Sequence, residues 1–244
     1  MSCSIVYKDV HYTYHDGTEA LCGLSFTLGH GEHVALLGPN GAGKSTAMLL
    51  SNGVLMPTSG ELFVGDLSLS KETLVRIRQR VGLVFQDPDD QLFNTTVYDD
   101  VAFGPRNMNL SKEEVDMRVS EALEAVSLLH KSEKAPQELS FGQKKRVALA
   151  TILAMQPDFL ILDEPTSNLD PRGRRQMIEL LHAIEATMLI ATHDLDLVWE
   201  LLPRSIIIDG GKIVADGPTQ ELLRDEALLA AHGLELPGAL RYKN

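Results

Sequence analysis

Residues 38–45 read Gly38-Pro39-Asn40-Gly41-Ala42-Gly43-Lys44-Ser45, and this stretch decides the fold. It matches the pattern G-x-x-x-x-G-K-[ST], in which glycines let backbone N–H groups approach phosphates. An apolar run at residues 34–37 predicts a buried strand before the loop, and a helix is expected from residue 46 to residue 50. Because a helix N-terminus attracts anions, the unit predicts a nucleotide-binding site. We expect Lys44 to reach the terminal phosphates, Ser45 to ligate Mg²⁺, and the site to extend to Thr46.

Four further apolar runs predict strands, with helical patterns between them. The runs occupy residues 81–85, 159–162, 188–191 and 206–208. Short buried strands that alternate with helices are typical of an α/β fold with a parallel sheet. Together with the phosphate loop, this pattern resembles a P-loop NTPase core of the RecA-like type. Residues 5–14 and 24–28 instead alternate between apolar and polar side chains around the turn Asp16-Gly17. We therefore expect an antiparallel β subdomain there.

The strand signals stop between residues 95 and 155. Ser111 and Glu114 form a capping-box pattern, and apolar residues follow at helical spacing at Val115, Val119, Leu123 and Val126. We expect one nucleotide-binding domain over residues 1–244, with its core at 1–94 and 156–216 and a helical subdomain at 95–155. A short C-terminal segment at 217–244 is expected to hold one helix at residues 222–231.

The charge balance disfavours a nucleic-acid partner. The sequence has 22 Lys and Arg against 34 Asp and Glu, a formal net charge of −12, and no basic run, so it repels polyanions. Cys3 and Cys22 have no redox or metal spacing, and His30 and His33 lack a third ligand for a transition metal. No apolar run forms a signal peptide or reaches the roughly 20 residues of a membrane-spanning helix. We expect a cytoplasmic protein that reaches a membrane only through a partner.

Two carboxylates follow the predicted strand at residues 159–162. Asp163 and Glu164 would lie at the carboxyl edge of the parallel sheet, where ligands bind in α/β folds. There Asp163 can hold Mg²⁺, and Glu164 can orient or deprotonate the water that attacks a phosphate. A strand that ends in a charged turn is common by itself, so this assignment depends on the phosphate loop.

A second predicted helix N-terminus carries a hydroxyl group. Leu139 is followed by Ser140, Phe141, Gly142 and Gln143, and then by a helical pattern at residues 144–154. The segment resembles the signature motif of ATP-binding-cassette proteins. Gln86, the turn at residues 167–170 and His193 match further motifs of that family, in the same order, across nearly the whole chain. Phe141 stands where the family usually has glycine, and we expect its ring to point away from the phosphate.

The resemblance implies an ATPase that binds ATP and Mg²⁺ and assigns roles to its matching residues. Tyr14 stacks on adenine, Gln86 senses Mg²⁺ and the attacking water, and His193 contacts the γ-phosphate. Ser140 to Gln143 act on the ATP of the opposite subunit and Asp170 belongs to the D-loop, which implies a homodimer or a heterodimer with a related ATPase. From the residues alone, Tyr14 is equally well explained as a packing residue of a β-hairpin.

Residues 84–93 and 100–107 resemble the ATPases of energy-coupling-factor transporters, especially cobalt and nickel importers, and residues 143–147 do as well. This resemblance implies two ATPase subunits at the cytoplasmic face of the inner membrane, a transmembrane coupling subunit and a membrane protein that captures the substrate. Cobalt is the first expectation, nickel the second and a vitamin the third. A soluble cassette ATPase of translation or DNA repair would usually carry two cassettes or a long insertion, and a P-loop kinase would lack residues 139–143.

The segment at residues 87–93, together with residues 99–106, is predicted to grip a short cytoplasmic helix of the coupling subunit. Its candidate docking residues are Asp87, Asp90, Gln91, Leu92 and Phe93. Exposed apolar residues among polar neighbours suit an interface in which a helix lies in a groove. The alternative is that Leu92 and Phe93 simply pack under the helical subdomain.

Overall fold

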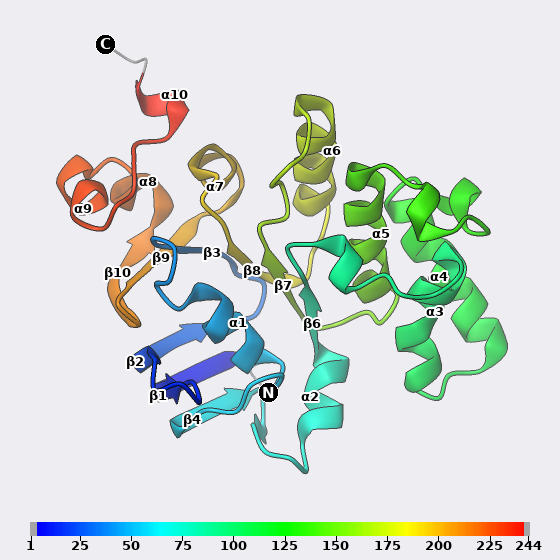
Figure 1. The fold of residues 1–244 in the computed structure, drawn as a ribbon, viewed down its shortest axis with the longest axis horizontal. Coiled ribbons are helices and arrows are strands. Elements are labelled where there is room, and N and C mark those ends of the chain that lie inside the picture. Colours follow the sequence, from blue (N-terminus) through cyan, green and yellow to red (C-terminus); the bar gives the residue numbers. More distant parts are fainter. Residues whose placement is uncertain (1–3, 242–244) are drawn as a thin grey trace.

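A six-stranded sheet forms the centre of the molecule (Figure 1). The computed structural model describes residues 4–241. The five predicted buried runs form five neighbouring parallel strands, and a sixth strand pairs antiparallel at one edge. In spatial order the strands are β10 (Lys212–Pro218), β9 (Arg204–Asp209), β3 (His33–Leu37), β8 (Thr187–Ala191), β7 (Phe159–Asp163) and β6 (Val81–Val84). The predicted α/β fold with a parallel sheet is confirmed.

A smaller antiparallel sheet lies beside the first helix. Its strands, in spatial order, are β2 (Glu19–Leu28), β1 (Ile5–Thr13), β4 (Ser59–Val64) and β5 (Leu67–Ser68). Helix α1 (Lys44–Ser51) packs against this sheet, and the buried Tyr7 hydroxyl of β1 donates to the carbonyl of Ala47 at 2.7 Å. Side chains of both sheets and of α1 share one hydrophobic core. The predicted antiparallel β subdomain is therefore present, and its core holds α1 in place.

Helices fill the chain between β6 and β7. They are α3 (Val97–Asn107), α4 (Lys112–Ala125) and α5 (Phe141–Leu153), which group at the right of Figure 1; α2 (Leu74–Arg80) precedes β6. The predicted capping box is present, because Ser111 Oγ accepts from the Glu114 N–H at 3.2 Å and Glu114 Oε2 accepts from the Ser111 N–H at 3.2 Å. The apolar face of α4 is buried as expected. Residues 95–155 remain the proposed extent of a helical subdomain.

The C-terminal segment differs from the prediction. The single helix expected at residues 222–231 is two helices, α8 (Thr219–Leu222) and α9 (Glu226–Ala231), and a short α10 (Gly238–Arg241) follows. Asp225 separates them because its carboxylate accepts from the Leu228 N–H at 2.9 Å and so starts a new helix. The remaining helices are α6 (Pro171–His182) and α7 (Leu195–Leu201). No helix within residues 4–241 is both long enough and apolar enough to span a membrane.

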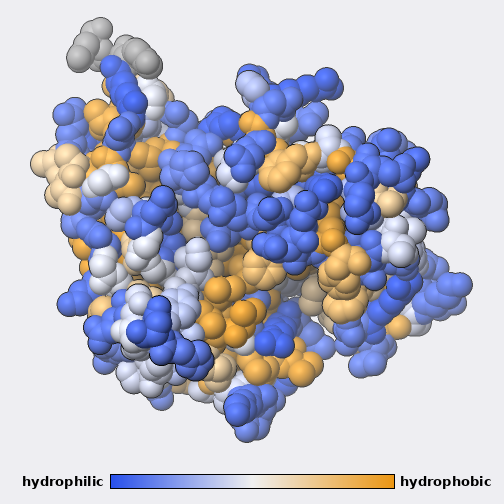
Figure 2. Space-filling view, viewed as in Figure 1, coloured by the Kyte–Doolittle hydropathy of each residue, from blue (hydrophilic) through white to orange (hydrophobic). Residues whose placement is uncertain are grey.

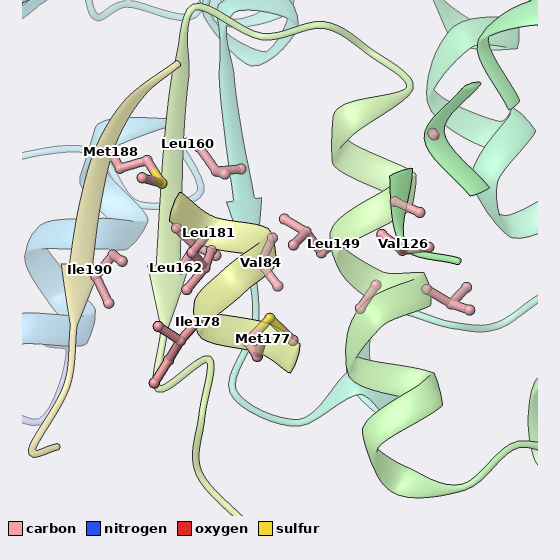
Figure 3. Packing of buried hydrophobic residues seen from close by; sticks show 14 of the residues in the cluster. Val84, Val126, Leu149, Leu160, Leu162, Met177, Ile178, Leu181, Met188 and Ile190 are labelled. Carbon is pink, nitrogen blue, oxygen red and sulfur yellow. The ribbon is translucent and has the colours of Figure 1, made fainter. Parts of the chain in front are cut away.

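One face of the central sheet packs against α5 and α6 (Figure 3). Leu162 of β7 and Ile190 of β8 lie near Ile178 of α6, and Leu149 projects toward them from α5. All four are buried. Since burying one such side chain contributes about 1.5–3 kcal/mol, this cluster fixes both helices relative to the carboxyl ends of β7 and β8.

Candidate functional site

The loop at residues 38–45 connects β3 to α1, and two of its glycines have no room for a side chain. A Cβ at position 38 would lie 2.0 Å from the carbonyl oxygen of Ile208, and a Cβ at position 43 would lie 2.5 Å from that of Ala20. Both glycines also have positive φ, at 148° and 104°, which L side chains rarely adopt. The glycines therefore let the loop curl tightly over the N-terminus of α1, where its backbone N–H groups can receive phosphates.

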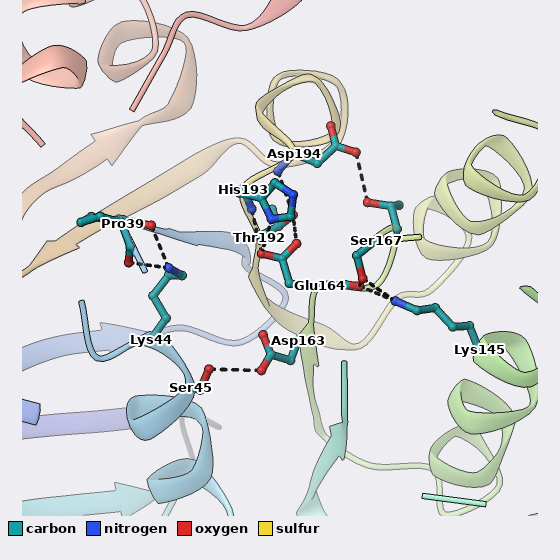
Figure 4. A network of polar contacts seen from close by, with 12 residues as sticks. Pro39, Lys44, Ser45, Lys145, Asp163, Glu164, Ser167, Thr192, His193 and Asp194 are labelled. Carbon is teal, nitrogen blue, oxygen red and sulfur yellow. Dashed lines mark hydrogen bonds and ion pairs between the residues drawn. The ribbon is translucent and has the colours of Figure 1, made fainter. Parts of the chain in front are cut away.

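Lys44 is the first residue of α1, and its side chain folds back over the loop (Figure 4). Its ammonium donates to the carbonyl oxygens of Gly38 at 2.7 Å and Pro39 at 2.9 Å. Burial lowers the pKa of Lys44, and the nearby carboxylates of Glu164 and Asp163 oppose that effect. The cation is thus held beside two acidic groups at the mouth of the loop, where an incoming phosphate would compensate its charge.

Ser45 and Asp163 meet across the site. Ser45 Oγ donates to Asp163 Oδ2 at 3.3 Å, and Gln86 lines the same cavity of about 340 Å³. Burial raises the pKa of Asp163, with a smaller opposing effect from the Ser45 hydrogen bond and a further increase from Glu164. A bound cation would favour the charged form of this buried carboxylate. Mg²⁺ prefers hard oxygen ligands, and the hydroxyl of Ser45, the amide of Gln86 and the carboxylate of Asp163 supply them. The predicted trio therefore fits that ion.

No transition-metal cluster appears in the described part of the chain: residues 4–241 contain no group of three or more His, Cys, Asp or Glu side chains that could hold a metal ion. Cys3 lies outside the described residues, and Cys22 is a free thiol in β2.

Tyr14 borders the nucleotide cavity just after β1. Its hydroxyl lies 2.9 Å from Thr46 Oγ1, and its ring meets Tyr12 edge to face at 4.9 Å. The residue is 38% exposed. One part of the ring is therefore engaged in packing, while the exposed part borders the cavity that also contains Asn40, Gly41 and Ala42. Adenine stacking on Tyr14 stays a prediction.

Glu164 and His193 come together because β7 and β8 are parallel neighbours that end at the same edge. Glu164 Oε1 accepts from the backbone N–H of His193 at 3.0 Å and lies 2.7 Å from His193 Nδ1, and Oε2 accepts from Thr192 Oγ1 at 3.0 Å (Figure 4). The Glu164 side chain is 11% exposed, whereas the imidazole is 74% exposed. The carboxylate is thus oriented by three contacts, and the exposed His193 borders a separate cavity with Asp194 and the C-terminal residues Gly233 to Gly238.

The backbone of Glu164 is unusual. Its φ is +45°, a left-handed conformation that non-glycine residues adopt mainly where their surroundings impose it. The Glu164 N–H donates to the carbonyl oxygen of Ala191 at 2.8 Å, and its own carbonyl accepts from the Ser167 N–H and hydroxyl at 3.2 and 2.9 Å. The turn after β7 therefore holds the acid at one fixed place on the sheet edge.

Ser140 caps α5, and the signature-like segment follows it. Ser140 Oγ accepts from the Gln143 N–H at 3.4 Å, and the Ser140 N–H donates to Gln143 Oε1 at 3.0 Å. Gly142 lies close to Leu169, because a Cβ there would be 3.4 Å from a methyl of that leucine. Asp170 caps α6 by accepting from the Gly173 N–H at 2.6 Å. The predicted signature and D-loop residues thus begin two helices that lie side by side in Figure 1.

Phe141 turns toward its own subunit. Its ring lies 5.7 Å from the Lys145 ammonium and borders a cavity with Gln86, Asp163 and Asn168. The expectation that the ring points away from the phosphate of a partner subunit remains a prediction, since it concerns a second chain.

Sequence analysis missed Lys145. This lysine is 3% exposed, and its ammonium donates to the carbonyl oxygen of Glu164 at 2.6 Å and to Ser167 Oγ at 2.9 Å. Burial lowers the pKa of Lys145 to about 8, although the charges of three nearby acids oppose that shift. Helical spacing could have predicted its burial, because Lys145 falls four residues after Phe141 and four before Leu149, on the buried face of α5.

The predicted docking segment is only partly exposed. Leu92 is 5% exposed and belongs to the hydrophobic core, so its assignment to a docking surface is wrong and the packing alternative holds for it. Gln91 also points inward, donating to the Ala148 carbonyl at 2.7 Å, and thereby anchors the segment to α5. Asp87 caps a short turn by accepting from the Asp89 N–H at 3.0 Å. Phe93, in contrast, is 65% exposed.

A groove of about 650 Å³ lies between α2 and α3, where Figure 2 shows apolar side chains around a hollow. Phe93 and Phe103 meet edge to face at 5.1 Å on its wall, and Asp90 lines it as well. Asp100 also borders the groove. Its Oδ1 accepts from the Phe93 N–H at 3.0 Å, but its buried Oδ2 has no hydrogen-bond partner among residues 4–241.

Comparison with known proteins places these features in one family. The sequence model described as ABC transporter matches residues 21–167. A putative ABC transporter ATP-binding protein of Geobacter sulfurreducens is 52% identical over 94% of this chain and 92% of its own length. An energy-coupling factor transporter ATP-binding protein of Methanocaldococcus jannaschii is 48% identical over 94% of this chain and 84% of its own length.

Two solved structures have the same fold. One is CbiO1 from Clostridium perfringens, described as part of the ABC transporter complex CbiONQ, with a TM-score of 0.83, 38% identity and coverage of 95% of this chain and 94% of that one. The other is the ATP-binding cassette MJ0796 as a dimer in a post-hydrolysis state bound to ADP and Pi. Its TM-score is 0.80 at 28% identity, over 88% of this chain and 98% of that one.

Proposed function

Because this chain belongs to the ABC transporter family, whose ATP-binding subunits hydrolyse ATP to drive transport, we propose that it powers an energy-coupling-factor importer of a transition metal ion. One observation carries the proposal. Lys44, Ser45 and the pair Asp163 and Glu164 converge on one cavity at the carboxyl edge of the parallel sheet. That edge is where nucleotides bind in α/β folds, and the set supplies a cation, metal ligands and a base.

Different residues of the site have different roles in the proposed hydrolysis. The loop amides and Lys44 bind the phosphates, and Ser45, Gln86 and Asp163 would hold Mg²⁺, which neutralises charge on the phosphate oxygens. Glu164 orients the attacking water and accepts its proton, since its carboxylate is already fixed by Thr192 and His193. His193 has an exposed ring that can contact the γ-phosphate while its Nδ1 stays beside Glu164.

A dimer completes the site in this proposal. Ser140 to Gln143 begin α5, an exposed helix N-terminus suited to the γ-phosphate of an ATP bound by a second subunit. Support comes from the MJ0796 cassette, which was solved as a dimer with ADP and Pi. The second subunit is either another copy of this chain or a related ATPase, and Asp170 lies in the turn that would face it.

The groove between α2 and α3 is the proposed docking site for a short cytoplasmic helix of the coupling subunit. Phe93 and Phe103 offer exposed apolar rings, and Asp90 offers charge at the rim. Asp100 borders the groove as well, and its Oδ1 accepts from the Phe93 N–H at 3.0 Å, which holds the backbone of Phe93 in place. Because the same segment follows Gln86, movement of the docked helix can reach the nucleotide cavity.

The proposed location is the cytoplasmic face of the inner membrane, through the coupling subunit and a separate membrane protein that captures the substrate. Cobalt is the first choice because residues 84–93 and 100–107 resemble cobalt and nickel importers; nickel and a vitamin follow. The relative described as an energy-coupling factor transporter ATP-binding protein supports the transporter type. A soluble cassette ATPase or a P-loop kinase is a weaker alternative.

The experiment is to purify the tagged chain from its native membranes and identify the proteins that accompany it. We expect two integral membrane proteins, one binding cobalt, and ATP-dependent cobalt uptake by vesicles that contain the complex. Purification of an active ATPase without any membrane protein would favour the soluble cassette ATPase instead. Uptake of nickel or a vitamin, but not cobalt, would change only the substrate.

A further inference from the structure

Lys145 connects α5, the helix that begins with the signature-like segment, to Glu164 of the same subunit. It projects from the second turn of α5, and its ammonium reaches the turn after β7 at Glu164 and Ser167 (Figure 4). At 2.6 Å, its contact with the Glu164 carbonyl is in the range of a short, charge-assisted hydrogen bond. The contact thus links two segments that are 19 residues apart in sequence.

The contacted carbonyl belongs to a strained residue. Glu164 has a φ of +45°, and its carbonyl accepts from the Lys145 ammonium, the Ser167 hydroxyl and the Ser167 N–H. Non-glycine residues persist in this conformation only when their neighbours over-determine it. Lys145 supplies the only charged donor among these three contacts, so its removal would weaken the set most.

Packing alone does not explain a lysine at this position. Lys145 lines a small cavity together with the apolar side chains of Val84, Leu149 and Met177, and its ammonium lies over the Phe141 ring. An apolar residue of the same length would fill this space without the cost of burying a charge. The lysine is therefore best explained by what its ammonium holds.

We propose that Lys145 is a positioning residue for ATP hydrolysis: it fixes the Glu164 backbone, and through it the carboxylate, at the place where water is activated. The proposal rests on the proposed role of Glu164. Because α5 also begins with Ser140, the contact makes the position of the signature-like segment and that of Glu164 depend on each other within one subunit.

The first test compares Lys145→Met, which keeps length and loses the donors, with Lys145→Arg, which keeps a cation. A misplaced catalytic group can cost up to about 100-fold, so we expect Lys145→Met to lower kcat on the order of 10-fold or more while KM for ATP changes less than about 2-fold. Lys145→Arg should recover most of kcat. Lys112→Met, at an exposed lysine of α4, is the matched control and should behave as wild type.

A mutant cycle separates this role from general loss of structure. In a Glu164→Gln background, single-turnover hydrolysis should be insensitive to Lys145→Met, because the group that Lys145 positions has already been disabled. An equal loss of rate in both backgrounds, or a raised KM with unchanged kcat, would overturn the proposal.

Ser167→Ala covers the case in which Lys145→Met does not fold, as judged by its melting temperature. This variant removes one hydroxyl donor from the same carbonyl and should reduce kcat by a smaller factor without changing KM. An unchanged kcat in Ser167→Ala, with Lys145→Met unfolded, would contradict the positioning role. If Glu164→Gln itself were fully active, the proposed function of Glu164 would fail; if only the Lys145 variants were fully active, the present inference alone would fail.

Discussion

Replacing Glu164 by glutamine keeps the shape of the side chain and removes one of its two acceptor oxygens. In the structure one oxygen accepts from the His193 N–H and lies near Nδ1, and the other accepts from the Thr192 hydroxyl. An amide offers one oxygen to these groups and turns an NH₂ toward the rest. The variant therefore loses both the base and part of the contacts that orient it.

The expected loss follows from the role of the group. A positioned general base contributes about 10²- to 10⁴-fold, so kcat of Glu164→Gln should fall by that factor, which corresponds to roughly 3–5 kcal/mol of barrier. ATP binding should persist, because the phosphate loop and Lys44 are unchanged, and the ATP-bound dimer should accumulate. By contrast, Lys44→Ala should weaken ATP binding itself.

The assay combines steady-state ATP hydrolysis, equilibrium ATP binding and size-exclusion chromatography with and without ATP. Glu113→Gln, at an exposed glutamate in the first turn of α4, is the matched control and should be fully active. Near-normal turnover in Glu164→Gln would refute the reasoning and move the catalytic role to another group, with His193 the next candidate.

Four further predictions concern assembly, docking, metal binding and pH. Specific ATPase activity should fall on dilution, because the site needs two subunits; activity independent of concentration in a verified monomer contradicts this. Phe93→Asp should leave the subunit folded and able to bind ATP but abolish co-purification with the membrane partner, whereas Leu92→Asp should unfold it; a Phe93→Asp variant that still assembles and transports moves the docking site elsewhere. Calorimetry on nucleotide-free subunit should find no tight stoichiometric cobalt or nickel site, and finding one would refute the assignment of metal capture to another protein. Burial alone would raise the pKa of Asp194, but the hydrogen bonds from Arg174 and the Leu197 N–H hold that pKa below its usual range. The Arg174–Asp194 pair should therefore stabilise the fold by on the order of 1 kcal/mol above about pH 4 and lose that effect as the pH falls through the lowered pKa. A stability difference between wild type and Arg174→Met that does not shrink in acid contradicts the pairing.

The phosphate loop and the strands could be predicted because local rules decide them. Glycine is required at positions 38 and 43 because the backbone approaches other groups closely there, and a sequence motif contains this requirement. A run such as residues 159–162 is apolar because the strand is buried on both faces. The order of parallel strands then places Asp163 and Glu164 at one edge. None of these inferences needs knowledge of distant contacts.

The missed features depend on tertiary packing. Lys145 is charged, and a lysine in a helix is usually exposed; only the position of α5 against the turn after β7 buries it. Leu92 and Phe93 are adjacent and equally apolar, yet one packs into the core and the other stays exposed, because Gln91 and Asp100 fix the local backbone. Sequence pattern gives no basis for telling these two apart.

The most direct test of transport is cobalt uptake into proteoliposomes that contain the complex purified with this chain. With ATP and Mg²⁺ on the side of the ATPase, the account predicts cobalt accumulation by the wild type and none above background with Glu164→Gln, although both complexes contain the same membrane proteins. Equal cobalt uptake by the two complexes, or ATP hydrolysis without uptake of cobalt, nickel or a vitamin, would contradict the claim that this ATPase powers such an importer.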